Sequence, residues 1–133
     1  MKMVLALAAL ALSSTAIAQS VEVASGNWSD IPQVKKQPPI RMADRTMARI
    51  DGLLKQGKCA RFGKGKVIKM DVPFLLQFGA GGVERIVVKR IDCPELESLI
   101  GGTLASHAKE GLFKPTGENG TGWYRSNFSY YVN

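Results

Sequence analysis

The chain is poor in the side chains that bind transition metals. It has one histidine and two cysteines among 133 residues, which leave little room for a zinc site built from nitrogen and sulfur ligands. It also lacks any long Pro/Gly or Ser tract, and its 45% hydrophobic and 22% charged residues are typical of a globular protein. Collagen-like, coiled-coil and fully disordered classes are therefore excluded. We expect no cofactor, and the length fits one domain.

Beyond the N-terminus, the sequence has no apolar run of about 18 residues, which a membrane-spanning helix would need. The N-terminus itself has the form of an export signal. Residues 1–3 carry a positive charge, residues 4–12 are apolar, and residues 16–18 form an Ala-x-Ala cleavage site. We expect residues 1–18 to be a cleavable signal peptide, with no transmembrane segment after cleavage. The short bacterial form of the signal predicts a periplasmic or secreted protein.

Export makes the two cysteines informative. Cys59 and Cys93 are the only thiols in the chain, and such a pair tends to form a disulfide in an oxidising compartment. For a loop of this length, chain entropy predicts a stabilisation of about 3–4 kcal/mol. The alternative is a pair of buried free thiols.

Positive charge is concentrated in residues 41–69, which contain nine basic and two acidic residues. The arginines at 41, 45 and 49 recur every four residues, so on a helix they would form one stripe. This stripe is either a solvated helix face or a contact with an anionic surface of the cell envelope. Nucleic acid is not expected as a partner, because Phe62 is the only aromatic residue in the segment. The candidate basic patch comprises Arg41, Arg45, Arg49, Lys55, Lys58 and Arg61.

The remaining pattern predicts the order of the structural elements. Residues 19–40 contain three prolines and predict an extended lead-in, with Trp28 as its large apolar anchor. The following elements are a helix over 42–56, strands over 72–78 and 83–90 joined by a glycine turn at 79–82, a second helix from Pro94 to about 110, and a final strand over 123–132.

The order α-β-β-α-β predicts a single α+β domain over residues 41–133. We expect a three-stranded antiparallel sheet with two helices packed on one face, and the third strand paired beside the first. Pro73 interrupts the first strand. A bulge or bend is expected there, or else the proline nitrogen faces an open edge.

The final strand alternates aromatic residues. Tyr124, Phe128 and Tyr130 should face the core, and Trp123 and Tyr131 should lie on the outer face of the sheet. Large outer-face aromatics need a cover, which a partner, a second copy or the lead-in could each provide.

No catalytic pattern emerges, and we expect no enzymatic activity. His107, the sole histidine, lies in the second predicted helix with Glu110 three residues away, and we interpret it as a surface histidine. Glu95 and Glu97 fall in the first turn of that helix, where carboxylates suit the helix dipole.

These elements together resemble the C-terminal domain of TonB-family periplasmic proteins, the TonB/TolA-like fold. That family pattern is a strand, a glycine-containing hairpin, a strand, a helix and an aromatic–basic–Pro stretch before the last strand. The matching parts are Val72–Phe78, Gly79–Gly82, Val83–Val88, Pro94–Glu110, Phe113–Lys114–Pro115 and the closing Phe128–Ser129–Tyr130. The resemblance covers about residues 59–132.

The resemblance implies a protein–protein interaction module, in which the last strand accepts an extended peptide by strand addition. The edge carried over to this chain consists of Trp123, Arg125, Asn127, Ser129 and Tyr131. The implied partner is a cell-envelope protein, such as an outer-membrane transporter, or a second copy of the chain. The sequence departs from TonB in lacking a membrane anchor and a Pro-rich spacer, so it is not expected to transmit force by itself. The alternative function is a secreted basic protein that binds an anionic envelope surface through residues 41–69.

Overall fold

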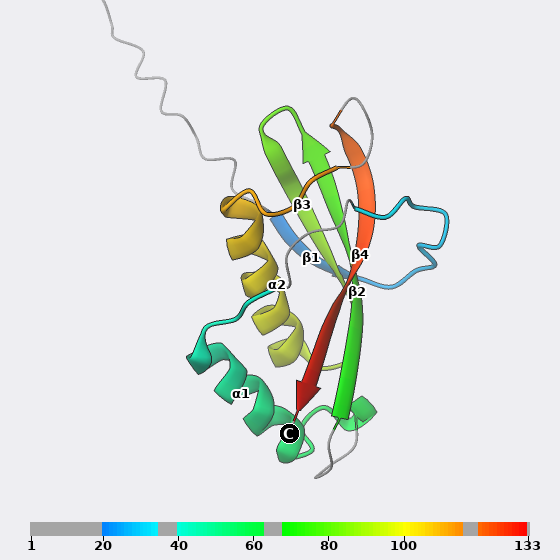
Figure 1. Cartoon of the computed structure of the whole chain (residues 1–133). Helices are drawn as coiled ribbons and strands as arrows, with labels where there is room; N and C mark the ends of the chain where they lie inside the picture. Colours follow the sequence, from blue (N-terminus) through cyan, green and yellow to red (C-terminus); the bar gives the residue numbers. More distant parts are fainter. Residues whose placement is uncertain (1–19, 35–39, 63–67, 116–119, 133) are drawn as a thin grey trace, which may run out of the picture.

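The computed structural model describes residues 20–34, 40–62, 68–115 and 120–132, so the expected signal peptide lies outside the described residues. The fold is α+β, with a four-stranded mixed sheet and two helices on one of its faces (Figure 1). The elements are β1 (Ser20–Ala24), α1 (Asp44–Lys55), a short 3₁₀ turn η1 (Ala60–Phe62), β2 (Ile68–Gly79), β3 (Gly82–Lys89), α2 (Pro94–Lys109) and β4 (Gly122–Val132).

The strand order is β1-β3-β2-β4. Strand β2 pairs antiparallel with β3 and with β4, so the last strand lies beside the first hairpin strand as predicted. The prediction of three antiparallel strands was wrong, because β1 adds a fourth strand parallel to β3. Residues 20–24 were assigned to an extended lead-in on account of the prolines downstream. Nothing local in a five-residue segment reveals that a distant strand edge will pair with it.

The hairpin contains a bulge, but not at Pro73. Gln77 pairs with Arg85 and the next residue, Phe78, pairs with Val83, which leaves Glu84 as the extra residue on β3. The turn ends at Gly82, whose φ of 111° lies in a region that suits glycine. The ladder between β2 and β4 runs through Pro73 without a shift of register.

The core lies between the sheet and the two helices. In β2, every second side chain from Met70 to Phe78 is buried, as the alternation predicted. Helix α1 contributes Ile50, Leu53 and Leu54, and α2 contributes Leu96, Ile100 and Leu104. From β4, Tyr124 and Phe128 are buried and Tyr130 packs against the edge of the core, as expected.

The predicted disulfide between Cys59 and Cys93 is confirmed. The two Cα atoms lie 5.3 Å apart, and the bridge joins the residue before η1 to the N-cap of α2. The N-cap makes no side-chain capping bond. Instead, the buried carboxylate of Glu97 accepts a hydrogen bond from the Ile91 backbone N–H at 2.8 Å. Glu97 is therefore part of the packing at the helix start and not a solvated first-turn charge.

After β1, the chain crosses the outer face of the sheet toward β4 (Figure 1). At the start of this crossing, Lys89 of β3 donates a hydrogen bond to the Gly26 carbonyl and its ammonium lies 4.8 Å from the centre of the Trp28 ring. At its end, the guanidinium Nε of Arg125 donates to the Ile31 carbonyl at 2.6 Å. Contacts of Trp28 and Arg125 thus hold the lead-in to the sheet, and it reaches the edge formed by β4.

Candidate functional site

Strand β4 forms one edge of the sheet, and its main-chain groups alternate between β2 and that edge. Arg125 fixes the alternation, because its N–H donates to the Pro32 carbonyl at 2.8 Å and its C=O accepts from the Val34 N–H at 3.0 Å. Both groups of Arg125 therefore point away from β2. In an antiparallel ladder this direction repeats every second residue. The same outward direction follows for Trp123, Asn127, Ser129 and Tyr131, the other four residues of the predicted edge.

The alternation also explains how a proline fits inside the sheet. Pro73 lies opposite Asn127, two residues along from the pair formed by Leu75 and Arg125. Pro73 and Asn127 therefore direct their main-chain groups away from each other, as Leu75 and Arg125 do. The missing N–H of Pro73 is thus not needed by β4. On the other side, the ladder with β3 begins at Phe74, opposite Val88, so Pro73 lies at the end of that ladder.

The described residues occupy the outward edge of β4 only in part. An isolated parallel bridge joins Gln33 to Arg125. Among the described residues, none makes a backbone hydrogen bond to the outward groups of Asn127 or Ser129. Within the described residues, the outward groups of Asn127 and Ser129 are therefore available to an added strand.

The outer-face side chains of β4 differ in their surroundings. Trp123 is half-buried, with the guanidinium of Arg85 5.1 Å from the centre of its ring. Ser129 donates to the Asp71 carboxylate at 2.5 Å. Tyr131 remains 62% exposed, although the Lys69 ammonium lies 5.8 Å from its ring. The edge thus ends in a large exposed aromatic side chain that an incoming peptide could cover.

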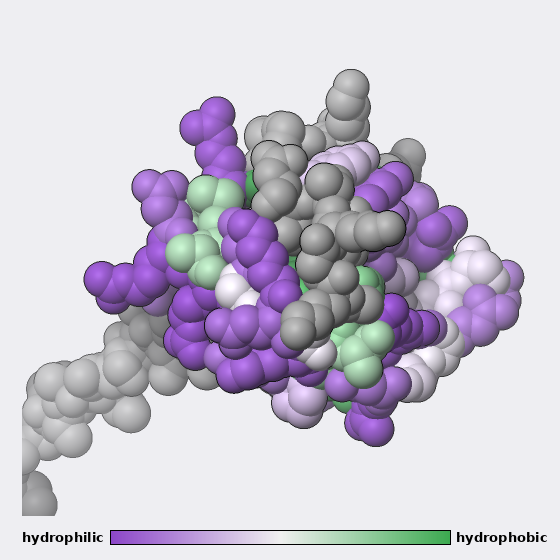
Figure 2. All heavy atoms as spheres, turned by 90° about the horizontal axis from the view of Figure 1, so that it is seen from below, coloured by the Kyte–Doolittle hydropathy of each residue, from purple (hydrophilic) through white to green (hydrophobic). Residues whose placement is uncertain are grey.

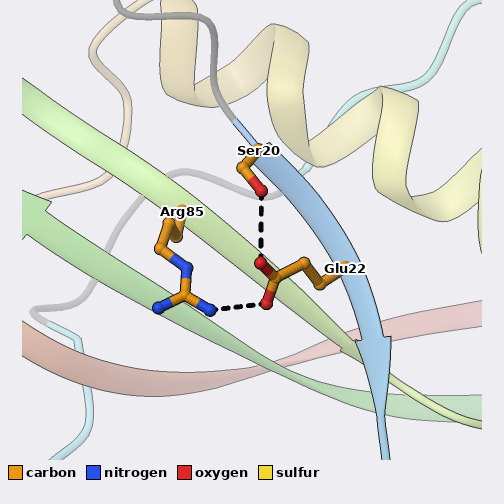
Figure 3. A network of polar contacts seen from close by, with 3 residues as sticks. All are labelled: Ser20, Glu22 and Arg85. Carbon is orange, nitrogen blue, oxygen red and sulfur yellow. Dashed lines mark hydrogen bonds and ion pairs between the residues drawn. The ribbon is translucent and has the colours of Figure 1, made fainter.

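A polar network stabilises the opposite edge of the same face (Figure 3). Arg85 donates to one carboxylate oxygen of Glu22 at 2.6 Å, and the Ser20 hydroxyl donates to the other at 3.3 Å. The hydrogen bond from Arg85 is the main reason that the pKa of Glu22 is lowered from its ordinary value. Since Arg85 also stacks on Trp123, this one guanidinium links the edge strand β1 to the edge strand β4 across the sheet.

The structure does not place all three arginines of the predicted stripe on one helix. Arg41 precedes α1 and is not part of it, because the helix begins at Asp44. Arg49 forms an ion pair with Glu95 at 2.8 Å, and Arg61 donates to the Arg90 carbonyl at 3.3 Å.

The other members of the patch, Arg45, Lys55 and Lys58, are exposed, and no acidic residue in the described part of the chain pairs with them. Seen from below, the described surface is mostly hydrophilic, with only small hydrophobic areas between the polar side chains (Figure 2).

A groove of about 730 Å³ runs along the outer side of α2, beneath the segment that leads into α1. Both sides of the groove mix apolar and polar side chains. It is lined by Arg41, Met42, Ala43, Thr46, Ser98, Leu99, Gly102, Thr103, Ser106, His107, Glu110 and Leu112. The sequence pattern did not reveal this groove, because its two walls are far apart in the chain.

The interpretation of His107 as a surface residue was wrong. The side chain is only 7% exposed, and its Nε2 lies 3.0 Å from the backbone nitrogen and 2.9 Å from the carbonyl oxygen of Arg41. Depending on the tautomer, the ring accepts from this N–H or donates to this carbonyl. The histidine thus holds the segment before α1 against α2. Its spacing from Ile100 and Leu104 on one helix face was the sequence signal for burial.

The described residues contain no group of three or more potential metal ligands, and no described helix is long and apolar enough to cross a membrane. No protein-family model matches the chain, and no match was found among the curated proteins or the solved structures.

Proposed function

We propose that this chain is an exported protein-interaction module of the TonB C-terminal type, which binds a partner in the cell envelope by adding an extended strand at β4. The observation that carries the proposal is the outward direction of the main-chain groups of Arg125, Asn127 and Ser129. Arg125 already pairs in parallel with Gln33, a residue of the lead-in of the same chain. Strand addition draws its affinity from such main-chain groups.

The disulfide and the expected signal peptide support the compartment. A bridged pair of buried cysteines is typical of oxidising environments. The periplasm is accordingly the location that we propose, with an envelope protein or a second copy of the chain as the partner.

The test compares two adjacent proline substitutions in β4. Asn127→Pro removes an N–H that points to the open edge, whereas Ser126→Pro removes one that points to β2. We expect Asn127→Pro to fold with nearly wild-type stability and to lose its partner in a pull-down from periplasmic extract. Ser126→Pro should lose about 1–3 kcal/mol of folding stability, because it removes a hydrogen bond of the ladder and leaves the partner carbonyl on β2 unsatisfied. If Asn127→Pro is folded and retains every partner of the wild type, strand addition at β4 is wrong.

The second candidate is binding to an anionic envelope surface. It is favoured by the exposed Arg45, Lys55 and Lys58, which no described acidic residue neutralises. Salt separates the two functions, because contacts between exposed charges are screened at high ionic strength. Strand addition should survive 0.5 M salt in the pull-down. Capture that disappears at high salt and is unaffected by Asn127→Pro would favour the basic surface.

A further inference from the structure

Three hydrogen bonds hold the segment Ile31–Val34 on β4, and all three converge on Arg125. The Arg125 N–H donates to the Pro32 carbonyl, the Val34 N–H donates to the Arg125 carbonyl, and the Arg125 Nε donates to the Ile31 carbonyl, at 2.8, 3.0 and 2.6 Å. Arg125 thus binds the main chain of the segment with both its own backbone groups and its own side chain.

The side chains of the segment suit this position. The N–H that Pro32 lacks has no role in the bridge, because only the carbonyl of Pro32 is used. Val34 is half-buried and packs against the core cluster. The contacts on β4 therefore use two successive carbonyls of the segment and the N–H of the apolar residue that comes two positions after the second carbonyl.

Within the described residues, the segment pairs with β4 at the single bridge between Gln33 and Arg125. A longer strand in the same parallel register would continue past Arg125 to Asn127 and Ser129, each of which offers one donor and one acceptor. A partner strand that begins as Ile31–Val34 does could thus form more hydrogen bonds than the internal segment makes. A segment that is held at a sheet edge opens at a lower free-energy cost than a core strand does.

We propose that Ile31–Val34 is an internal stand-in for the partner, and that the partner is an extended peptide that displaces it and pairs in parallel with β4. This inference rests on the proposed function and adds the chemistry and the register of the ligand. The expected partner motif begins with an apolar residue and then a proline or another residue whose N–H is not needed. An apolar residue follows two positions later, and alternating strand formers come after it.

The probe is a fluorescein-labelled decapeptide. It carries the sequence of residues 29–34, Ser-Asp-Ile-Pro-Gln-Val, followed by Thr-Val-Thr-Lys, and a scrambled version is the control. Because the pairing is parallel, the added residues run along the open part of β4 toward Tyr131. Binding is measured by fluorescence anisotropy on the full mature chain.

The key variant is Val34→Pro, which removes the N–H that the internal segment donates to Arg125. Val34→Thr keeps that N–H and the branched shape, and serves as the matched control. An internal competitor lowers the apparent affinity by the fraction of time that the edge is open. We expect Val34→Pro to bind the probe at least about tenfold more tightly than the wild type and Val34→Thr, and the scrambled peptide to bind none of them.

The double variant Val34→Pro with Asn127→Pro separates the two proposals. If the probe still binds the double variant as tightly as Val34→Pro, the site is not the β4 edge and both proposals are wrong. If Asn127→Pro abolishes binding but Val34→Pro binds no more tightly than the wild type, strand addition stands and the internal stand-in is wrong.

Amide hydrogen exchange on the wild type gives a readout that does not depend on the folding of any variant. At saturating probe, the Asn127 and Ser129 amides should gain protection, while the Val34 amide should lose it. A Val34 amide whose protection is unchanged when the edge amides become protected would overturn the displacement.

Discussion

Gly101 of α2 and Val21 of β1 lie so close together that a Cβ atom at position 101 would be 2.6 Å from Cγ1 of Val21. Gly101 is buried, whereas its neighbour Gly102 is exposed and a Cβ there would meet nothing within 4 Å. The glycine at 101 thus provides the space in which the edge strand β1 docks against the helix.

The two glycines form a matched pair of substitutions. Gly102→Ala should raise the free energy of unfolding by up to about 1 kcal/mol, because alanine is the better helix former. Gly101→Ala gains the same propensity but must displace Val21, and overpacking of this kind costs about 1–3 kcal/mol. Urea denaturation of both variants measures the difference. Equal stabilisation by the two substitutions would show that β1 does not dock against α2 in solution.

The disulfide should provide a large share of the folding stability. Replacing Cys59 and Cys93 together by alanine is expected to cost about 3–4 kcal/mol, because the unfolded chain gains the freedom of the opened loop. Chemical denaturation with and without a reductant tests this expectation. The reductant should destabilise the wild type by a similar amount and leave the double variant unchanged. A wild type that is indifferent to reduction would contradict the prediction.

Tyr130 should make folding sensitive to alkaline pH. Burial, together with the carboxylate of Asp51, raises its pKa to about 12 from 10.0, since both oppose the phenolate. The folded state therefore holds the proton more tightly than the unfolded state. The corresponding stability is fully present below pH 10 and is lost as the pH rises through about 12.

Two phenylalanine variants test the role of Tyr130. Tyr130→Phe loses the hydrogen bond to Asp51, which is 2.7 Å long, and should cost about 0.5–1.5 kcal/mol at neutral pH. It should also show a weaker loss of stability between pH 10 and 12. Tyr131→Phe is the control. The side chain of Tyr131 is exposed, so the loss of its hydroxyl should leave the folding stability unchanged. Ultraviolet titration of the phenols follows the ionisation directly.

The ion pair between Glu22 and Arg85 should appear as a pH effect at the other end of the scale. Because the pKa of Glu22 is lowered in the folded state, its contribution to stability is present above the ordinary pKa of a glutamate and lost as the pH falls through the lowered value. Carbonyl NMR of Glu22 should show an upward shift of its pKa in Arg85→Gln. Arg85→Lys, which keeps the charge, should retain part of the lowering. A Glu22 pKa that is the same in all three proteins would exclude the hydrogen bond as its cause.

Local patterns in the sequence were sufficient for most of the secondary structure. Alternation from residue 70 to 78 predicted the buried face of β2, and the glycines after Phe78 predicted the hairpin turn. Helical spacing predicted α1 and α2 to within two residues at the start of each. Export signals and a count of two cysteines predicted the bridge that the structure confirms. The helices, the strands and the turn depend on residues a few positions apart. The disulfide could be predicted because the chain has no third cysteine.

The tertiary structure decided the edges of the sheet and the buried polar residues. Strand β1 exists because β3 offers it an edge more than 60 residues away, and Ile31–Val34 lies on β4 because Arg125 binds its carbonyls. The partners of His107 and Glu97 are backbone groups of other segments, Arg41 and Ile91. The sequence by itself determined which segments are helices and strands, since periodicity is local. Which main-chain groups remain at the edge, and which segment covers them, was decided by contacts between distant parts of the chain.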